Sequence, residues 1–240
     1  MLGLSILITR PMHQYQALAD LLQAQGAMTL SLPAIEIQPY VNLSDEASES
    51  LIQATDLFIV TSANAILNLK EKFKLQVMQK RLVAIGPGTR KILELIGARD
   101  VMMPDQYNSD SIFAMAIFRK ESLKITLMTG KNGRVVWQAP LNSLGHTVSI
   151  LETYQRQLPQ YDLKRLMSKL ESINWIVSTS QEGLENLDQI FEGEQAWLLS
   201  KNLVVIKPSM RDWALTHQWR GEIRVAKDAS NAAILKALFR

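Results

Sequence analysis

The feature that most constrains the fold is a series of short apolar runs, each followed by a stretch with helical periodicity. Six runs favour buried strands, at residues 5–8, 57–60, 82–85, 125–128, 175–177 and 203–206. After the first run, apolar residues from Tyr15 to Leu22 share one helical face, and Gly26 is well suited to end that helix. Strands that alternate with amphipathic helices indicate βα units, so we predict an α/β fold with parallel sheets.

The sequence also repeats itself with an offset of about 120 residues, which is the size of a domain. The matched pairs are residues 7–9 with 127–129, 59–62 with 177–180, and 82–90 with 203–211. Because the three matches occur in the same order along the chain, we predict two similar α/β domains.

Two alternating stretches favour strands that link these domains. Residues 35–40 and 151–156 occupy corresponding positions in the two halves, and the second lies just before Pro159. Together they predict a two-stranded β connector. Tyr154 lies on the second strand, where its hydroxyl can face a ligand and donate or accept a proton. The structural alternative is an ordinary half-buried strand tyrosine.

Composition excludes several classes of protein. The 240 residues are 47% hydrophobic and contain no cysteine, which excludes disulfides, thiolate metal sites and a cysteine nucleophile. The net charge of +3 comes without a cluster of Lys and Arg, so we expect no nucleic-acid partner. No apolar run reaches the roughly 18 residues of a membrane helix. The N-terminus lacks the features of a signal peptide, and we expect a cytoplasmic protein.

Six segments follow the predicted strands and are rich in Thr, Ser and Gly: residues 9–11, 61–64, 86–89, 129–134, 178–180 and 207–209. Ligands of parallel sheets bind beyond the carboxyl ends of the strands, where these segments lie. We expect all six to open onto helices, whose first N–H groups attract anions. The set suits a ligand with many carboxylates, although such residues in any one segment alone are usually ordinary helix caps.

Other motifs are incomplete. Residues 130–134 lack the spacing and the terminal Lys-Ser/Thr of a phosphate loop, and Gly86 and Gly88 are only part of a dinucleotide fingerprint. Neither Ser62 nor Ser180 lies in the Gly-x-Ser-x-Gly elbow of serine hydrolases. The three histidines have no metal-ligand spacing, and we expect His13, His146 and His217 to be surface or capping residues.

Family-like stretches run along nearly the whole chain. They are residues 7–11, 61–62, 84–89, 130–134, 154–156 and 177–180, followed by a C-terminal set from Val205 through Ser209 and Ala214 to 225–226 and 229–231. In these residues and in their order, the chain resembles the uroporphyrinogen-III synthase family.

The resemblance implies two flavodoxin-like parallel-sheet domains joined by the two-stranded connector. One domain would comprise residues 1–36 and 158–240, the other residues 41–150, with residues 37–40 and 151–157 as the connecting strands. The implied substrate is hydroxymethylbilane, a linear tetrapyrrole, held between the domains. Its ring A would lose water and its ring D would be inverted through a spiro intermediate to give uroporphyrinogen III. The family implies no metal, no organic cofactor and a monomer.

The same resemblance assigns roles to individual residues. Tyr154 would assist loss of the substrate hydroxyl. A second group would hold substrate carboxylates: Thr9, Arg10, Ser62, Gly86, Thr89, Ser180 and Ser209. Lys131 and Arg134 would pair with further carboxylates. Two alternatives use the same loops, namely a non-catalytic two-domain receptor for a small anionic ligand and a nucleotide- or flavin-dependent enzyme.

Overall fold

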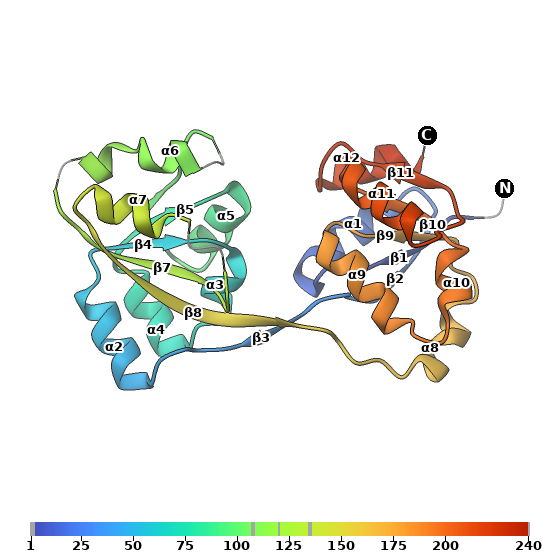
Figure 1. The fold of residues 1–240 in the computed structure, drawn as a ribbon, viewed down its shortest axis with the longest axis horizontal. Coiled ribbons are helices and arrows are strands. Elements are labelled where there is room, and N and C mark those ends of the chain that lie inside the picture. The colour runs from blue at the N-terminus through green and yellow to red at the C-terminus, as the bar shows by residue number, and fades with distance from the viewer. Residues whose placement is uncertain (1–2, 107–108, 120, 134–135, 240) are drawn as a thin grey trace. The chain divides into compact units, whose positions relative to one another are not determined.

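The computed structural model describes residues 3–106, 109–119, 121–133 and 136–239 (Figure 1). Contacts divide the chain into two compact units. Unit 1 comprises Met1–Glu36 and Gln157–Arg240, and unit 2 comprises Ile37–Arg156. Unit 1 is therefore built from both ends of the chain.

Within its described residues, unit 1 contains a five-stranded sheet of order β11-β10-β9-β1-β2, with every pair parallel. The strands are β1 (Ser5–Ile8), β2 (Met28–Ser31), β9 (Trp175–Val177), β10 (Asn202–Val205) and β11 (Ile223–Val225). The helices are α1 (Met12–Gln23), α8 (Leu163–Leu170), α9 (Gln181–Ile190), α10 (Gln195–Leu199), α11 (Pro208–Thr216) and α12 (Asn231–Leu238).

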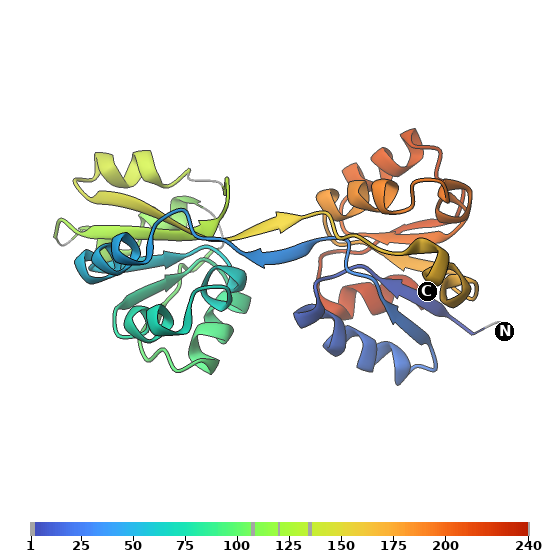
Figure 2. The same ribbon diagram turned by 90° about the horizontal axis from the view of Figure 1, so that it is seen from below.

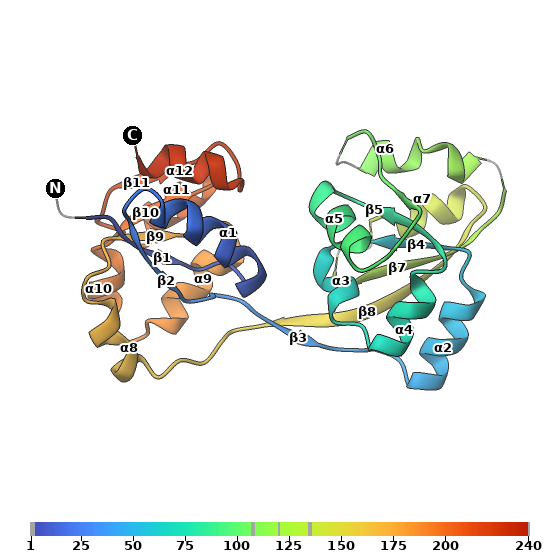
Figure 3. The ribbon, with the colours of Figure 1, turned by 180° about the vertical axis from the view of Figure 1, so that it is seen from behind.

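Unit 2, in the part that is described, contains a six-stranded sheet of order β3-β8-β7-β4-β5-β6. The strands are β3 (Glu36–Pro39), β4 (Leu57–Val60), β5 (Arg81–Ala84), β6 (Val101–Met102), β7 (Lys124–Gly130) and β8 (Thr147–Gln157). The helices are α2 (Asp45–Ala54), α3 (Ala63–Leu67), α4 (Glu71–Val77), α5 (Pro87–Leu95), α6 (Ser109–Phe113), the 3-10 helix η1 (Ala116–Arg119) and α7 (Gln138–Ser143). Strands β3 and β8 run side by side (Figure 3), and the chain passes from one unit to the other at β3 and at the end of β8.

Both sheets are buried on both faces, which explains the continuous apolar runs. In β1, Ile6 and Ile8 pack in the cluster that contains residues of α1 and α12, whereas Leu7 packs in the cluster of α9 and α10. The strand β4 alternates in the same way, because Phe58 and Leu57 belong to different clusters. Helices accordingly lie on both faces of each sheet (Figure 2).

The predicted α/β class is confirmed, with sheets that are rich in parallel strand pairs, and so are the six predicted strands. The strands β1, β4 and β9 have the predicted bounds, and β5 and β10 begin and end one residue earlier than predicted. The sixth, β7, extends beyond the predicted run at both ends. Ile85 and Ile206 already belong to the turns that lead into α5 and α11. The first predicted helix is also confirmed as α1, and Gly26 follows it with a φ of 81°, a conformation that favours glycine.

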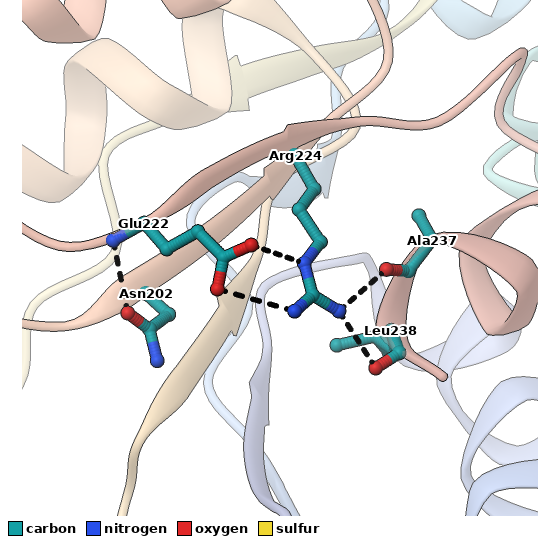
Figure 4. Close-up of polar contacts among 5 residues, drawn as sticks. All are labelled: Asn202, Glu222, Arg224, Ala237 and Leu238. Carbon is teal, nitrogen blue, oxygen red and sulfur yellow. Dashed lines mark hydrogen bonds and ion pairs between the residues drawn. The ribbon is translucent and has the colours of Figure 1, made fainter. Parts of the chain in front are cut away.

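Arg224 fixes the carboxyl end of α12 (Figure 4). Its guanidinium donates to the carbonyls of Ala237 and Leu238, at 2.9 Å each, and satisfies two carbonyls at the helix end. The same group pairs with Glu222 at 2.7 Å and lowers the pKa of that carboxyl by hydrogen bonding. The backbone N–H of Glu222 donates in turn to the side chain of Asn202. Strands β10 and β11 are thereby tied to the last helix.

None of the helices formed by the described residues is long and apolar enough to cross a membrane.

Candidate functional site

Each unit gathers three of the six predicted loop segments at the carboxyl edge of its sheet. In unit 1, the segments follow β1, β9 and β10, which are neighbours in the sheet. In unit 2, they follow β4, β5 and β7, which are also neighbours. The predicted residues therefore form two sets, with Thr9, Arg10, Ser180 and Ser209 in unit 1 and Ser62, Gly86, Thr89, Lys131 and Tyr154 in unit 2.

Tyr154 lies on β8 and is buried, with 4% of its surface exposed. Its hydroxyl oxygen accepts a hydrogen bond from the Ser62 hydroxyl at 3.1 Å. The ring lies against Gly130 of β7, because a Cβ added there would be 2.7 Å from Cζ of the tyrosine. The neighbouring Lys131 N–H donates to the Tyr154 carbonyl at 2.7 Å. Backbone and side chain are thus both fixed, and the hydroxyl has a single orienting donor among the described residues.

Two further hydroxyls hold the elements around Tyr154. Thr61 donates from its side chain to the carbonyl of Met128 at 2.9 Å, which links the ends of β4 and β7. Thr153 donates from its side chain to the carbonyl of Ala65 at 2.6 Å, which links β8 to α3. These bonds keep the strand that carries Tyr154 close to the helix that follows Ser62.

The loop that begins α5 is the second component of the unit 2 site. Gly86 precedes the helix in an extended conformation, Pro87 begins it, and Thr89 is buried in its first turn. No acidic residue lies in that turn, so the positive end of this nine-residue helix is not neutralised locally. An anion at this position would meet free N–H groups and a partial positive charge.

The segment after β7 contradicts the expectation that all six segments open onto helices. Asn132 adopts a left-handed conformation with a φ of 55°, and Gly133 N–H closes a turn on the Gly130 carbonyl. The next helix, α7, begins only at Gln138. The N–H of Asn132 is also taken by the Glu152 carboxylate at 2.8 Å. A turn that needs a left-handed residue replaces the helix start.

Of the two cations predicted in this segment, Lys131 is among the described residues. Lys131 is exposed, and its Nζ lies 4.8 Å from the centre of the Tyr40 ring, a cation–π contact. Arg134 lies outside the described residues.

In unit 1, the equivalent hydroxyls have mainly structural contacts. Thr9 donates from its side chain to the Val177 carbonyl at 2.9 Å and ties β1 to β9. Ser180 accepts the Gly183 N–H at 3.0 Å and is the N-cap of α9. Ser209 is exposed in the first turn of α11, which follows the exposed Lys207.

Arg10 is a buried cation, with 4% of its surface exposed. Its terminal nitrogens donate to the Asn231 side chain at 2.8 Å and to the Ala229 carbonyl. Its Nε is buried and has no partner among the described atoms. No carboxylate of the described residues forms an ion pair with it, and burial lowers the pKa of its guanidinium. A cation in this state attracts an external carboxylate.

The histidines only partly match the prediction of surface or capping positions. His217 is exposed and follows α11, with Nδ1 2.8 Å from the Trp213 carbonyl, as predicted. For His146 the prediction is wrong: it is buried, its Nδ1 accepts the Leu123 N–H, and its Nε2 lies 3.2 Å from the Phe118 carbonyl. Its polar atoms find partners far along the chain, which no local pattern shows. The side chain of His13 is outside the described part.

The described residues contain no group of three or more His, Asp or Glu side chains that could hold a metal ion.

Sequence reasoning missed the contacts that join these residues. Ser62 was predicted to bind a ligand directly, and its bond to Tyr154 was not foreseen. Asn231, which anchors Arg10, and Gly130, which makes room for the Tyr154 ring, were not predicted as site residues at all. The sequence signals were that all three lie in the family-like stretches, and that Ser62 and Gly130 also lie in two of the six polar segments that follow predicted strands.

Comparisons with known proteins agree over nearly the full length. The family model described as Uroporphyrinogen-III synthase HemD matches residues 16–236. The uroporphyrinogen-III synthase of Salmonella typhimurium is 28% identical, and that of Escherichia coli is 27% identical; each match covers 98% of this chain and 100% of the relative. Among solved structures, the synthetase of Helicobacter pylori has a TM-score of 0.64 at 14% identity, covering 98% of both chains. A mutant synthase of Thermus thermophilus has a TM-score of 0.55 at 16% identity, covering 99% of this chain and 98% of that one.

Proposed function

The chain belongs to the uroporphyrinogen-III synthase family and cyclises hydroxymethylbilane to uroporphyrinogen III, and we propose that Tyr154 and the loops at the carboxyl edges of both sheets carry out this reaction. The observation that carries the assignment is the family match over residues 16–236, which includes every residue of the candidate site except Thr9 and Arg10.

The first chemical step is departure of the hydroxyl from ring A of the substrate. Tyr154 donates its proton to that hydroxyl, the carbon–oxygen bond breaks, and water leaves while the ring nitrogen supplies the electron pair. Ring D then attacks through its substituted carbon to give the spiro intermediate, which fragments and recloses with ring D inverted. The proton released when the last ring regains its aromaticity returns to the tyrosine, so the net products are uroporphyrinogen III and water.

The contact between Ser62 and Tyr154 supports this role. Since the tyrosine oxygen accepts the hydrogen bond from Ser62, its own O–H is not used in that bond and remains available for donation.

The loops supply the positioning that the reaction needs. The free substrate closes spontaneously without inverting ring D, so the protein must select one folded form of a flexible polyanion. In unit 2, the N-terminus of α5 with Gly86 and Thr89 receives substrate carboxylates, and Lys131 offers a charge. In unit 1, Thr9, Ser180 and Ser209 line the loops, and Arg10 supplies a cation that lacks a carboxylate partner among the described residues. Arg134 is assigned to the same task from its sequence position.

The arrangement that we propose has two flavodoxin-like domains, residues 1–36 with 158–240 and residues 41–150, joined by connecting strands at 37–40 and 151–157. The substrate binds to loops of both domains, and the enzyme acts as a monomer in the cytoplasm. The internal repeat, the division into two compact units and the pairing of β3 with β8 support this arrangement. The reaction involves no net oxidation or reduction, and so it requires no electron-carrying cofactor.

The test is the isomer that the purified protein makes. Hydroxymethylbilane is incubated with and without the protein, the products are oxidised, and type I and type III uroporphyrins are separated chromatographically. We expect type III to dominate with the protein present and type I without it. An unchanged excess of type I would contradict the proposal and favour the alternative of a non-catalytic receptor.

A further inference from the structure

Ser62 occupies a helix-cap position without acting as a cap. It immediately precedes α3 in an extended conformation, the position from which a serine hydroxyl usually accepts a helix N–H. Its hydroxyl accepts none of the described N–H groups, and the Ala65 N–H bonds instead to the Ser62 carbonyl at 3.0 Å. The hydroxyl donates to Tyr154. The side chain is therefore committed to the tyrosine and not to the helix.

The tyrosine is also held by the backbone of β7, the strand that lies between β8 and β4 in the sheet. The pairing of β7 with β8 is irregular between Thr129 and Gly130, and this shift places Gly130 opposite Tyr154. With no Cβ at Gly130, the ring can lie directly on the strand, and its hydroxyl end reaches Ser62. One residue thus fixes the plane of the ring and the other fixes its oxygen.

We propose that Ser62 is a positioning residue for Tyr154, acting on the reaction through the tyrosine rather than by holding a substrate carboxylate. The inference rests on the proposed function, in which Tyr154 donates the proton. By donating to the tyrosine oxygen, Ser62 leaves the phenol proton free and directs it away from the protein toward the substrate hydroxyl.

The same hydrogen bond is stronger in the transition state than in the ground state. As the proton leaves, negative charge develops on the oxygen that Ser62 already faces, and hydrogen bonds to charged groups are about twice as strong as neutral ones. Only interactions of this kind raise kcat, because a bond of equal strength in both states changes nothing in the chemical step.

A double-mutant cycle tests the proposal. Ser62→Ala should lower kcat about tenfold, the effect expected for one lost hydrogen bond, with KM nearly unchanged. Ser62→Thr, which restores a hydroxyl, should recover most of the rate. In the Tyr154→Phe background, Ser62→Ala should have no further effect, since there is no oxygen left to position.

The outcomes separate this inference from the proposed function. If Tyr154→Phe keeps the wild-type rate, the role proposed for Tyr154 fails. Two other outcomes would show that Ser62 acts on the substrate and would overturn the positioning role. One is that Ser62→Ala lowers kcat further in an already slowed Tyr154→Phe enzyme. The other is that Ser62→Ala alone raises KM without lowering kcat. Unchanged kcat in Ser62→Ala overturns it as well.

A spectroscopic readout distinguishes positioning from a general loss of stability. The protein has five tyrosines, so 3-fluorotyrosine labelling gives separate fluorine resonances, and Tyr154→Phe identifies the one from Tyr154. Ser62→Ala should move that resonance and Ser62→Thr should return it. Ser44→Ala is the matched control: Ser44 caps α2 in the same unit by accepting the Ala47 N–H, so its loss should lower stability and leave the Tyr154 resonance and kcat in place. A Tyr154 resonance that moves in the control and not in Ser62→Ala would contradict the proposal.

Discussion

Ser180 of unit 1 and Ser62 of unit 2 occupy matching positions in the internal repeat, yet their hydroxyls have different partners. Ser180 accepts the Gly183 N–H and caps α9, a helix of 10 residues. Ser62 donates to Tyr154 and leaves α3, a helix of 5 residues, without a side-chain cap among the described groups. A serine at matching positions thus caps a helix in one unit and bonds to a buried tyrosine in the other.

The two units also differ at the ends of β1 and β7, the strands that neighbour β9 and β4 in their sheets. Residues 7–9 match 127–129, so Arg10 and Gly130 follow the matched residues at equivalent positions. Arg10 fills its position with a long buried side chain, whereas Gly130 leaves room for the ring of Tyr154. Two copies of one scaffold thus hold different buried side chains at this position, a cation in unit 1 and a tyrosine ring in unit 2.

We expect the largest loss of stability and activity at Gly130, because the matched residues Arg10 and Gly130 differ most in side-chain size. Gly130→Ala places a methyl group 2.7 Å from the Tyr154 ring and should displace it, lowering stability by about 2 kcal/mol and kcat by about a hundredfold. Chemical denaturation and isomer-resolved kinetics measure both. Gly88→Ala is the control for stability, because no described atom lies within 4 Å of its added methyl group. Equal stabilities for the two variants would show that the ring does not depend on this glycine.

Two arginines of unit 1 bond to opposite ends of α12, Arg224 at the carboxyl end and Arg10 at the amino end. Arg224→Met removes two hydrogen bonds to the last helical carbonyls, so we expect a loss of about 2 kcal/mol in the free energy of unfolding. KM for hydroxymethylbilane should not change. An Arg224 variant with weakened substrate capture but normal stability would assign it a binding role instead.

Arg10→Met should show the reverse pattern. Arg10 lies at the N-terminal end of α12, and we propose that it binds a substrate carboxylate. Its loss should then raise KM about tenfold, as expected for one charge-assisted hydrogen bond. Initial-rate kinetics at several substrate concentrations give KM and kcat separately. An unaltered KM together with a lowered melting temperature would make Arg10 a structural tie to the segment around Asn231.

The smallest effect is expected at Ser180. Ser180→Ala removes the cap of α9 and should lower stability by about 1 kcal/mol, and Ser180→Asp, which also caps helices well, should restore it. Hydrogen exchange provides the local readout, since the Gly183 amide should exchange faster in the alanine variant. If that amide is unaffected, the distinction between Ser180 and Ser62 loses its basis.

Much of the fold can be predicted from the sequence because the central strands of both sheets are buried on both faces, so each of them contains an unbroken apolar run such as residues 57–60. The strands β2, β6 and β11 are short or partly exposed, and the sequence did not predict them. Tyr154 could be placed on a strand by its alternating neighbours. Its contact with Ser62 could not be predicted, because it depends on the irregular pairing at Gly130, which arises only when β7 and β8 meet. The turn at Asn132 and the burial of His146 were missed for the same reason, since partners distant in the chain determine both.

The most direct test of the account is the rate at which Tyr154→Phe forms uroporphyrinogen III in a single turnover with excess enzyme. The account predicts a fall of about a hundredfold, the usual contribution of a general acid, so that spontaneous closure makes type I the main product. The variant should remain folded, since it keeps the ring that packs against Gly130. Formation of the type III isomer at the wild-type rate would contradict the account.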